Sequence, residues 1–265
     1  MERDWESTIK DLPLVRNLLE RRYEKKFATD GYGLFRGVFP NFQEASASAP
    51  GNKPVGFDHE AYTREFESRL GKVFSFDYPV MFWLNRILKP GMKLFDYGGH
   101  RGTHFYAYSQ YVAYPAGFEW TVCDLPEIIA AGKKLADEKN AGNLKFTTDI
   151  ANATSAQILL AAGSLQYVES PSFADSVSAL NQKPEHLILN KLPLYAGKQY
   201  VTLQNGGPAF HPQYVFNRRE FIDSLVDIGY ALIDQWDVPS HPGSIPFHPE
   251  ASFRSHSGLY FKRRL

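Results

Sequence analysis

The chain has 265 residues, and its 29 basic side chains balance 29 acidic ones, so the formal net charge is zero. This balance argues against a nucleic-acid binder, which needs surplus Lys and Arg to displace counterions from phosphate. Hydrophobic residues make up 43% of the chain and charged residues 22%, a composition that excludes a disordered protein. Aromatic residues reach 15%, which indicates a sizeable core.

The single cysteine, Cys123, excludes an internal disulfide bond and a zinc site built from cysteines. Its surroundings, Trp120 to Asp124, are typical of a buried strand, so we predict a small core residue rather than a nucleophile. The charged residues 1–6 are unlike a secretory signal, and no apolar run has the length of a membrane span. We therefore expect a cytoplasmic protein without a membrane span.

Residues 1–75 differ from the rest of the chain and are predicted to form an accessory helical cap. Apolar residues from Trp5 to Phe27 recur at helical spacing, and Pro13 breaks or restarts that helix. Residues 31–57 are predicted to be a loop, and Asp58 is a candidate N-cap for a helix that ends near Gly71.

Residues 76–265 are predicted to form a second domain, in which strands alternate with helices. The predicted strands cover residues 93–97, 119–124, 144–148, 157–162, 187–190, 230–238 and 257–262. The predicted helices begin after the caps Asp77 and Asn217 and also cover residues 103–112, 126–139 and 173–180. Residues 192–213 and 239–249 are predicted to be long loops, which are commonly lids or binding loops. The predicted fold class is α/β: a Rossmann-like, seven-stranded, mostly parallel sheet with helices on both faces and an antiparallel last strand.

A glycine-rich turn follows the first strand of this domain. The strand ends near Asp96, and Gly98, Gly99 and Gly102 precede a helix. Open α/β sheets bind ligands at the carboxyl ends of their strands, and these glycines permit a tight turn with the helix close to the strand. Their spacing fits neither the nicotinamide dinucleotide fingerprint nor a phosphate-binding P-loop. An acid followed by such a turn suits a ligand with a positively charged amino-acid portion and no pyrophosphate.

Two further acids end the next two strands. Asp124 can accept hydrogen bonds from both hydroxyls of a ribose, and Asp149, with the backbone of Ile150, can meet the amino edge of an adenine. Each acid by itself is more often a helix or turn cap. Three acids at the ends of consecutive strands, with the glycine turn at the first, indicate an adenosine site.

Four motifs together resemble the class I S-adenosylmethionine-dependent methyltransferases. They are Asp96-Tyr-Gly98-Gly-His-Arg-Gly102, Val122-Cys-Asp124-Leu-Pro126, Thr148-Asp149-Ile150 and Leu160-Ala-Ala-Gly163-Ser164-Leu-Gln-Tyr167. The Asp-Leu-Pro sequence of the second motif is shared with plant-type small-molecule O-methyltransferases. The resemblance covers residues 77–265, and it looks closest to methyltransferases often encoded near surface-polysaccharide genes.

This resemblance implies S-adenosylmethionine as the cofactor. Asp96 and the glycine turn would face its methionyl end, Asp124 would hold the ribose and Leu125 would pack on the adenine. One departure from the family is His100, which replaces the middle glycine of an acid-x-Gly-x-Gly-x-Gly pattern and could crowd the cofactor. The cofactor-binding residues implied are Asp96, Gly98, Gly99, Gly102, Asp124, Leu125, Asp149, Ile150, Gly163 and Ser164.

Three residues are candidates for catalysis. Methyl transfer to a hydroxyl gains from a general base, and His211, in the long loop, is the favoured base, although a structural role is open. His104 lies near the cofactor turn, and Tyr167 lies where an acceptor should sit. His100 and His104 stand four residues apart, but no third ligand and no His-Glu-x-x-His motif accompany them, so no metal is expected.

The sequence therefore predicts a methyltransferase that acts on a small molecule or saccharide, with O-methylation of a sugar hydroxyl favoured by analogy. Neither a nucleic-acid partner nor a membrane span is expected. Two alternatives remain open. A non-catalytic protein that binds adenosine or S-adenosylmethionine would be compatible with His100, whereas an NAD-dependent sugar-modifying enzyme is disfavoured by the glycine spacing.

Overall fold

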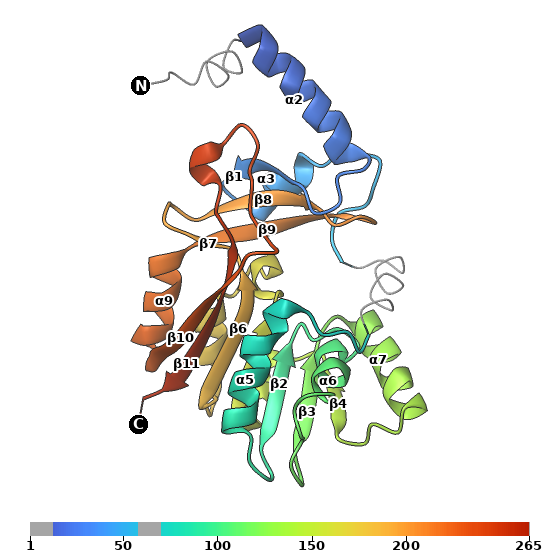
Figure 1. The fold of residues 1–265 in the computed structure, drawn as a ribbon, viewed down its shortest axis with the longest axis vertical. Helices are drawn as coiled ribbons and strands as arrows, with labels where there is room; N and C mark the ends of the chain where they lie inside the picture. The colour runs from blue at the N-terminus through green and yellow to red at the C-terminus, as the bar shows by residue number, and fades with distance from the viewer. Residues whose placement is uncertain (1–12, 58–69, 265) are drawn as a thin grey trace. The chain divides into compact units, whose positions relative to one another are not determined.

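The computed structural model describes residues 13–57 and 70–264 (Figure 1). The chain divides into two compact units. The smaller unit contains residues 1–57, 200–213 and 244–252, and the larger unit contains residues 58–199, 214–243 and 253–265. The sequence suggested one boundary near residue 75, whereas the smaller unit also takes in two segments from the second half of the chain.

A seven-stranded sheet forms the centre of the larger unit and confirms the predicted fold class. Its strand order is β10-β11-β6-β5-β2-β3-β4. Neighbouring strands from β4 through β6 are parallel, and β11 runs antiparallel to both β6 and β10. The strands are β2 (Lys93–Tyr97), β3 (Glu119–Cys123), β4 (Leu144–Thr147), β5 (Ile158–Ala162), β6 (His186–Leu192), β10 (Tyr230–Val238) and β11 (His256–Arg263).

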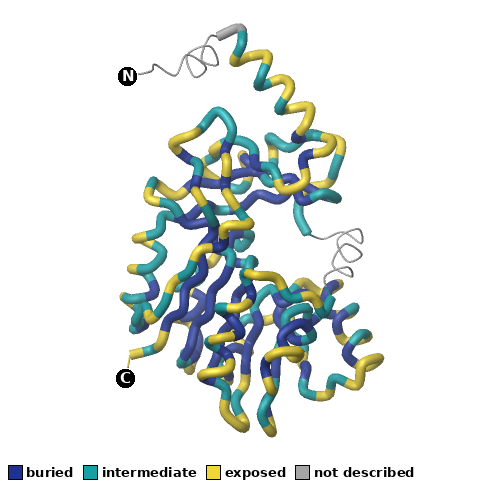
Figure 2. Tube along the Cα trace, viewed as in Figure 1, coloured by how far each residue is buried: buried dark blue, intermediate teal, exposed yellow. Residues whose placement is uncertain are grey.

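Helices cover both faces of this sheet, because successive strand residues point to opposite sides. Leu94 and Trp120 belong to a core cluster with α5 (Tyr78–Ile87), α6 (Thr103–Tyr108) and α7 (Pro126–Glu138). Phe95 and Cys123 belong to a second cluster on the other face, with α8 (Phe173–Ser178) and α9 (Arg218–Asp227). Figure 2 shows these strands as the most buried part of the unit, and Cys123 is a buried core residue, as predicted.

The smaller unit has its own small core. It contains α2 (Pro13–Ala28), β1 (Phe35–Phe39), α3 (Phe42–Ala47), β8 (Tyr200–Asn205) and the first half of β9 (Phe210–Asn217). Phe27, Leu203 and Phe210 are fully buried against one another. α2 begins at Pro13, where the sequence predicted a break or a restart, and the part of the predicted helix before it lies outside the described residues. The predicted helix that begins at Asp58 lies outside the described residues.

Two loop predictions were wrong. Residues 31–57 contain β1 and α3, and residues 192–213 contain β7 (Leu194–Tyr195), β8 and the start of β9. β1 pairs antiparallel with β8, and the second half of β9 pairs with β7 in the larger unit. β1, β7 and β8 are short, and β1 lies more than half the chain away from its partner β8. Local alternation of apolar and polar residues therefore did not identify these strands.

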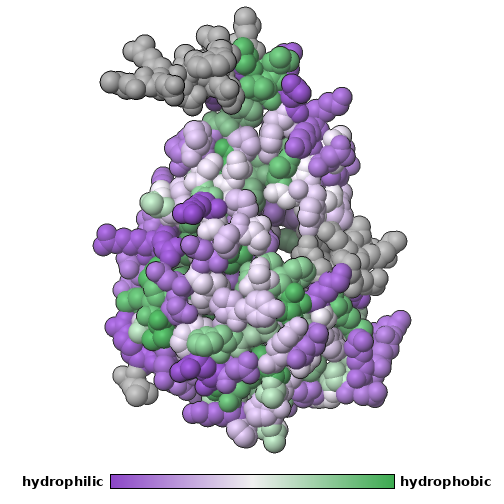
Figure 3. All heavy atoms as spheres, in the orientation of Figure 1, coloured by the Kyte–Doolittle hydropathy of each residue, from purple (hydrophilic) through white to green (hydrophobic). Residues whose placement is uncertain are grey.

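The surface mixes polar and apolar side chains. On the face drawn in Figure 3, hydrophilic residues are interspersed with smaller apolar areas. Large exposed apolar side chains belong to several elements, among them Leu18, Phe82 and Leu125. Among the described residues, no helix combines the length and the hydrophobicity that crossing a membrane requires.

Candidate functional site

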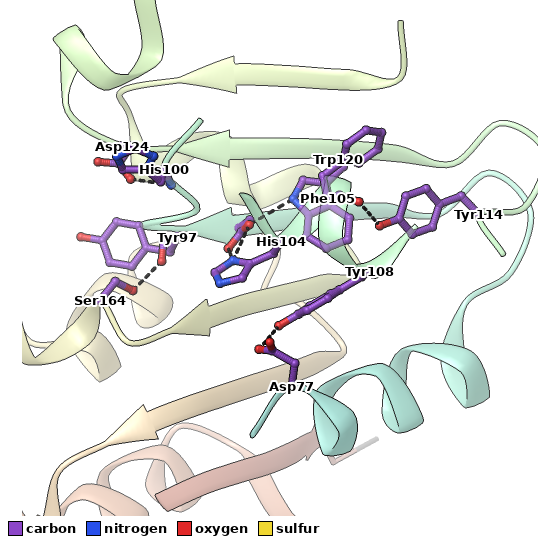
Figure 4. Close-up of polar contacts among 11 residues, drawn as sticks. Asp77, Tyr97, His100, His104, Phe105, Tyr108, Tyr114, Trp120, Asp124 and Ser164 are labelled. Carbon is purple, nitrogen blue, oxygen red and sulfur yellow. Dashed lines mark hydrogen bonds and ion pairs between the residues drawn. The ribbon is translucent and has the colours of Figure 1, made fainter. Parts of the chain in front are cut away.

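The glycine turn joins the carboxyl end of β2 to α6 and packs against the end of β5. Gly98 has φ 77°, and a Cβ atom there would clash with the side chain of Ser164. Ser164 Oγ in turn donates a hydrogen bond of 2.5 Å to the carbonyl oxygen of Tyr97 (Figure 4). Gly102 has φ 84° and begins α6, and a Cβ atom there would lie 2.8 Å from Leu144. The sequence prediction of a close-packed turn is therefore confirmed.

His100 occupies a glycine-like backbone conformation. Its φ is 54°, in the left-handed region that costs a non-glycine residue roughly 1–2 kcal/mol. Its side chain is buried, and its backbone N–H donates to Asp124 Oδ2 at 2.8 Å. The middle position of the turn thus has a backbone conformation that favours glycine while it carries an imidazole.

Asp124 follows β3 directly and is held by backbone donors. Its two carboxylate oxygens accept hydrogen bonds of 2.8 Å from the N–H groups of His100 and Leu125. Burial raises the pKa of Asp124 to about 6, although the two backbone N–H groups oppose that rise. The next side chain, Leu125, is 41% exposed. A fixed carboxylate beside an exposed apolar side chain can receive the hydroxyls of a ribose and the face of an adenine.

Asp96 lies beneath the glycine turn and contacts protein groups. Its side chain has no exposed surface, and a Cβ atom at Gly99 would clash with its carboxylate. Trp120 Nε1 donates to Asp96 Oδ2 at 3.2 Å, and His104 Nδ1 lies 3.1 Å from the same oxygen. The sequence expectation was that Asp96 faces the methionyl end of the cofactor. In this structure, the Asp96 carboxylate contacts the imidazole of His104 and the indole N–H of Trp120.

His104 is held from two sides. Besides Asp96, its ring stacks on Tyr108 with the ring centroids 5.5 Å apart. Tyr108 is itself fixed, because its hydroxyl donates to Asp77 Oδ1 at 2.9 Å. The His104 side chain retains 13% exposure. An imidazole that is oriented by a buried carboxylate and still reaches the surface is equipped to exchange a proton.

Asp149 and Ile150 follow β4 at the same edge of the sheet. Asp149 is exposed, and its Oδ1 accepts a hydrogen bond of 2.9 Å from Ala151 N, which caps the 3-10 helix η3 (Ile150–Ser155). Ile150 is half-buried against the core. The capping role considered for Asp149 is therefore present, and its contact with adenine stays a prediction.

Lys191 is a residue at this edge that the sequence reasoning missed. Lys191 is the second-last residue of β6 and has φ 55°. A Cβ atom at Gly163 would lie 2.9 Å from Lys191 Cε. Its ammonium group lies 5.1 Å from the centroid of the Phe76 ring. The positive φ of Lys191 is a property of the folded chain, so no pattern in the sequence predicts it. Tyr167, the acceptor-site candidate, is half-buried in the 3-10 helix η4 (Leu165–Tyr167).

His211 belongs to the smaller unit, whereas the other candidate residues belong to the larger one. It lies in β9 rather than in a loop and is 1% exposed. Its ring stacks on Phe57, with centroids 3.9 Å apart and an interplanar angle of 20°. These contacts are those of a core residue within its unit, and its role as a base stays a prediction.

Comparison with known proteins supports the fold. No model of a known protein family matches the chain, and no curated protein matches its sequence. Among solved structures, an S-adenosylmethionine-dependent methyltransferase from Aquifex aeolicus is similar, with 14% identity, a TM-score of 0.51, and coverage of 77% of this chain and 98% of that one. The 1,6-didemethyltoxoflavin-N1-methyltransferase from Burkholderia thailandensis, bound to 1,6-didemethyltoxoflavin and S-adenosylhomocysteine, has 16% identity, a TM-score of 0.50 and coverage of 82% and 95%.

The fold is thus that of the class I S-adenosylmethionine-dependent methyltransferases. A third similar structure, the [4+2]-cyclase SpnF, has 13% identity, a TM-score of 0.50 and coverage of 71% of this chain and 81% of that one. A protein named for a cyclisation therefore shares this fold, so the activity has to be argued from the site itself.

Proposed function

We propose that this protein is an S-adenosylmethionine-dependent methyltransferase that methylates a hydroxyl group of a small molecule or saccharide. The observation that carries the proposal is the Asp124 carboxylate, held by two backbone N–H groups beside the glycine turn. The saccharide preference rests on the sequence resemblance to methyltransferases encoded near surface-polysaccharide genes. The cytoplasmic location expected from the sequence is part of the same proposal.

The residues at the strand ends fit an adenosine ligand. Asp124 has free acceptor capacity for ribose hydroxyls, since each carboxylate oxygen can accept more than one hydrogen bond. Leu125 offers an exposed apolar surface for a base, and Gly98 keeps side-chain atoms away from the turn. The turn lacks the glycine spacing that favours a pyrophosphate, which fits a ligand without phosphates better than NAD.

His104 is the base that we assign to the reaction. Bound S-adenosylmethionine supplies an electrophilic methyl group on a positively charged sulfur. The hydroxyl oxygen of the acceptor forms a bond to the methyl carbon, the carbon–sulfur bond breaks and its electron pair stays on sulfur. His104 donates its Nδ1–H to Asp96, so its Nε2 carries the lone pair that takes the hydroxyl proton.

The first prediction concerns the ligand. In calorimetric titrations, S-adenosylmethionine and S-adenosylhomocysteine should bind and NAD should not. An Asp124→Ala variant should bind the first two about 10- to 100-fold more weakly, because the ribose hydroxyls lose a charged acceptor. Asp137→Ala, which removes an exposed acid on α7, is the matched control and should bind normally. If the wild-type protein binds neither compound, the proposal fails; normal binding by Asp124→Ala would overturn the site assignment.

The second prediction separates catalysis from adenosine binding. A His104→Gln variant should keep its affinity for S-adenosylmethionine and lose methyl transfer by about 100-fold or more, because it lacks the proton acceptor. Transfer is measured as S-adenosylhomocysteine formed in the presence of a panel of monosaccharides. An active wild-type enzyme whose His104→Gln variant transfers at the same rate would show that another group is the base. Ligand binding without transfer to any acceptor would favour the non-catalytic alternative.

A further inference from the structure

A cavity of about 220 Å³ opens in the larger unit next to the candidate cofactor site. Tyr97 and Leu165 line it, and each is the immediate neighbour of a residue in the site, Gly98 and Ser164 respectively. The hydrogen bond from Ser164 Oγ to the Tyr97 carbonyl ties these two walls together. The rest of the lining comes from the loop after η4, from α8 and its N-cap Ser172, from α9, from the second half of β9 and from Gln199.

The cavity wall is aromatic and negatively charged. Two carboxylates, Glu169 and Glu220, line it, and the described lining includes no Lys, Arg or His. Both glutamates are exposed, and neither has a basic partner in the described part of the chain. The aromatic rings in the lining are those of Tyr97, Phe173, Tyr214, Phe216 and Phe221.

The serine hydroxyls of the wall already donate their hydrogens to the protein. Ser172 Oγ donates to Asp175 Oδ2 at 2.7 Å, and Ser176 Oγ donates to the Ser172 carbonyl at 3.0 Å. Ser224 Oγ donates to the Phe221 carbonyl at 2.8 Å. Each hydroxyl therefore offers a ligand only oxygen lone pairs, and Ser172 Oγ already accepts one hydrogen bond of 3.2 Å from Asp175 N. Besides the Gln199 amide and the hydroxyls of Tyr97 and Tyr214, which can also donate, the polar groups of the wall are serine oxygens and carboxylates that accept hydrogen bonds.

We propose that this cavity binds the acceptor substrate and that the acceptor carries a protonated amine, as an amino sugar does. This inference rests on the proposed methyltransferase function and specifies its substrate class. An ammonium group supplies hydrogen-bond donors to the carboxylates and serine oxygens, and its positive charge is attracted to aromatic faces. The volume suits a single six-membered ring. The ammonium anchors one end of the acceptor in the cavity, and the hydroxyl that is methylated lies on the part of the acceptor that extends out of the cavity toward the glycine turn.

Two pairs of probes test the charge preference on the full-length protein, with and without S-adenosylhomocysteine. Glucosamine is compared with glucose, and tyramine with 4-ethylphenol, because the members of each pair differ at the amine. Affinities are measured by calorimetry or ligand-observed NMR at pH 7. In at least one pair, the amine should bind about fivefold or more tightly than its neutral partner, an effect in the range expected for a partly exposed charge pair with an aromatic contact.

Variants assign the preference to this cavity. A Glu169→Gln/Glu220→Gln double variant should lose the preference, and the affinity ratio should fall toward one. Glu138→Gln, which neutralises an exposed acid on α7, should keep it. Thermal melts verify that the wild-type protein, the double variant and Glu138→Gln are folded. The single variants Glu169→Gln and Glu220→Gln should each show an intermediate affinity ratio of amine to neutral probe.

The inference is overturned if amine and neutral probes bind equally, if none binds, or if the preference survives in the double variant. Its failure is distinct from that of the proposed function, because the same samples are titrated with S-adenosylmethionine. Tight binding of S-adenosylmethionine without amine discrimination leaves the methyltransferase proposal standing and removes only the substrate class.

Discussion

At the scale of single residues, Asp124 links the candidate site to pH. Its pKa of about 6 in the folded protein exceeds the value of an unperturbed aspartate, because burial disfavours the charge. Between about pH 4 and 6, the folded protein therefore holds a proton that the unfolded chain has released. This group makes folding less favourable as the pH rises through that window, by about 2–3 kcal/mol in total.

The same titration should control cofactor affinity. The ionised carboxylate accepts ribose hydroxyls better than the neutral acid, so the affinity for S-adenosylmethionine should rise as the pH increases from 5 to 7.5. An Asp124→Asn variant should bind more weakly with a flatter pH profile, whereas Asp149→Asn should keep the wild-type profile. Calorimetry at three pH values checks both statements. A wild-type affinity that does not change across this range would contradict the role of Asp124.

Residue spacing predicted some residues of the candidate site. It missed others, because their positions depend on contacts that form only in the folded chain. Asp96, Gly98 and Asp124 stand at strand ends, where alternation along the chain predicts a shared edge. The contact between His104 and Asp96 was not visible, since it depends on the register of β2 and on how α6 begins. Lys191 was missed because packing against Gly163 sets its backbone conformation.

At the scale of elements, the closing hairpin, which is the antiparallel pair of strands β10 and β11, depends on one glycine. Trp236 in β10 pairs with Gly258 in β11, and its indole lies where a Cβ atom of residue 258 would be. The indole Nε1 then donates to Asn190 Oδ1 at 3.1 Å, which connects β10 to β6 across the strand between them. A side chain at position 258 would displace the ring and break that hydrogen bond.

Gly258→Ala should therefore destabilise the protein by about 2 kcal/mol or more, through displacement of the indole and loss of a partly buried hydrogen bond. Gly142→Ala is the matched control, because a Cβ atom there has no neighbour within 4 Å among the described residues. Its free energy of unfolding should stay within about 0.5 kcal/mol of wild type. Urea unfolding of both variants measures the difference, and equal stabilities would show that the indole moves without cost.

Elements buried on both faces were the easiest to predict. β5 is a continuous apolar run with every residue buried, which is typical of a central parallel strand. The bounds of β2 and β10 match their predicted ranges. The strands β1, β7 and β8 were taken for loops, because they lie outside the strand–helix alternation that identified the larger sheet.

At the scale of the whole molecule, each compact unit is built from segments that are not contiguous in the chain. The alternation of strands and helices predicted the larger unit well, since the connections from β2 to β3, β3 to β4 and β5 to β6 join neighbouring parallel strands, and only that from β4 to β5 crosses other strands of the parallel part. The composition of the smaller unit was not predictable in the same way. Residues 200–213 and 244–252 belong to the smaller unit although the segments on either side of them belong to the larger one, and the pairing of β8 with β1 has no local signature.

This arrangement has a consequence for synthesis on the ribosome. β1 leaves the ribosome early, but its partner β8 follows only after β2 through β6 have been made. The larger sheet is completed even later, because β11, which follows the other strands in the chain, lies between β6 and β10. A nascent chain that stops before residue 256 completes neither the sheet of the larger unit nor its closing hairpin. Until β8 has been made, β1 exposes an edge that another chain can pair with, and β6 exposes one until β11 has been made, so the incomplete chain is prone to aggregation.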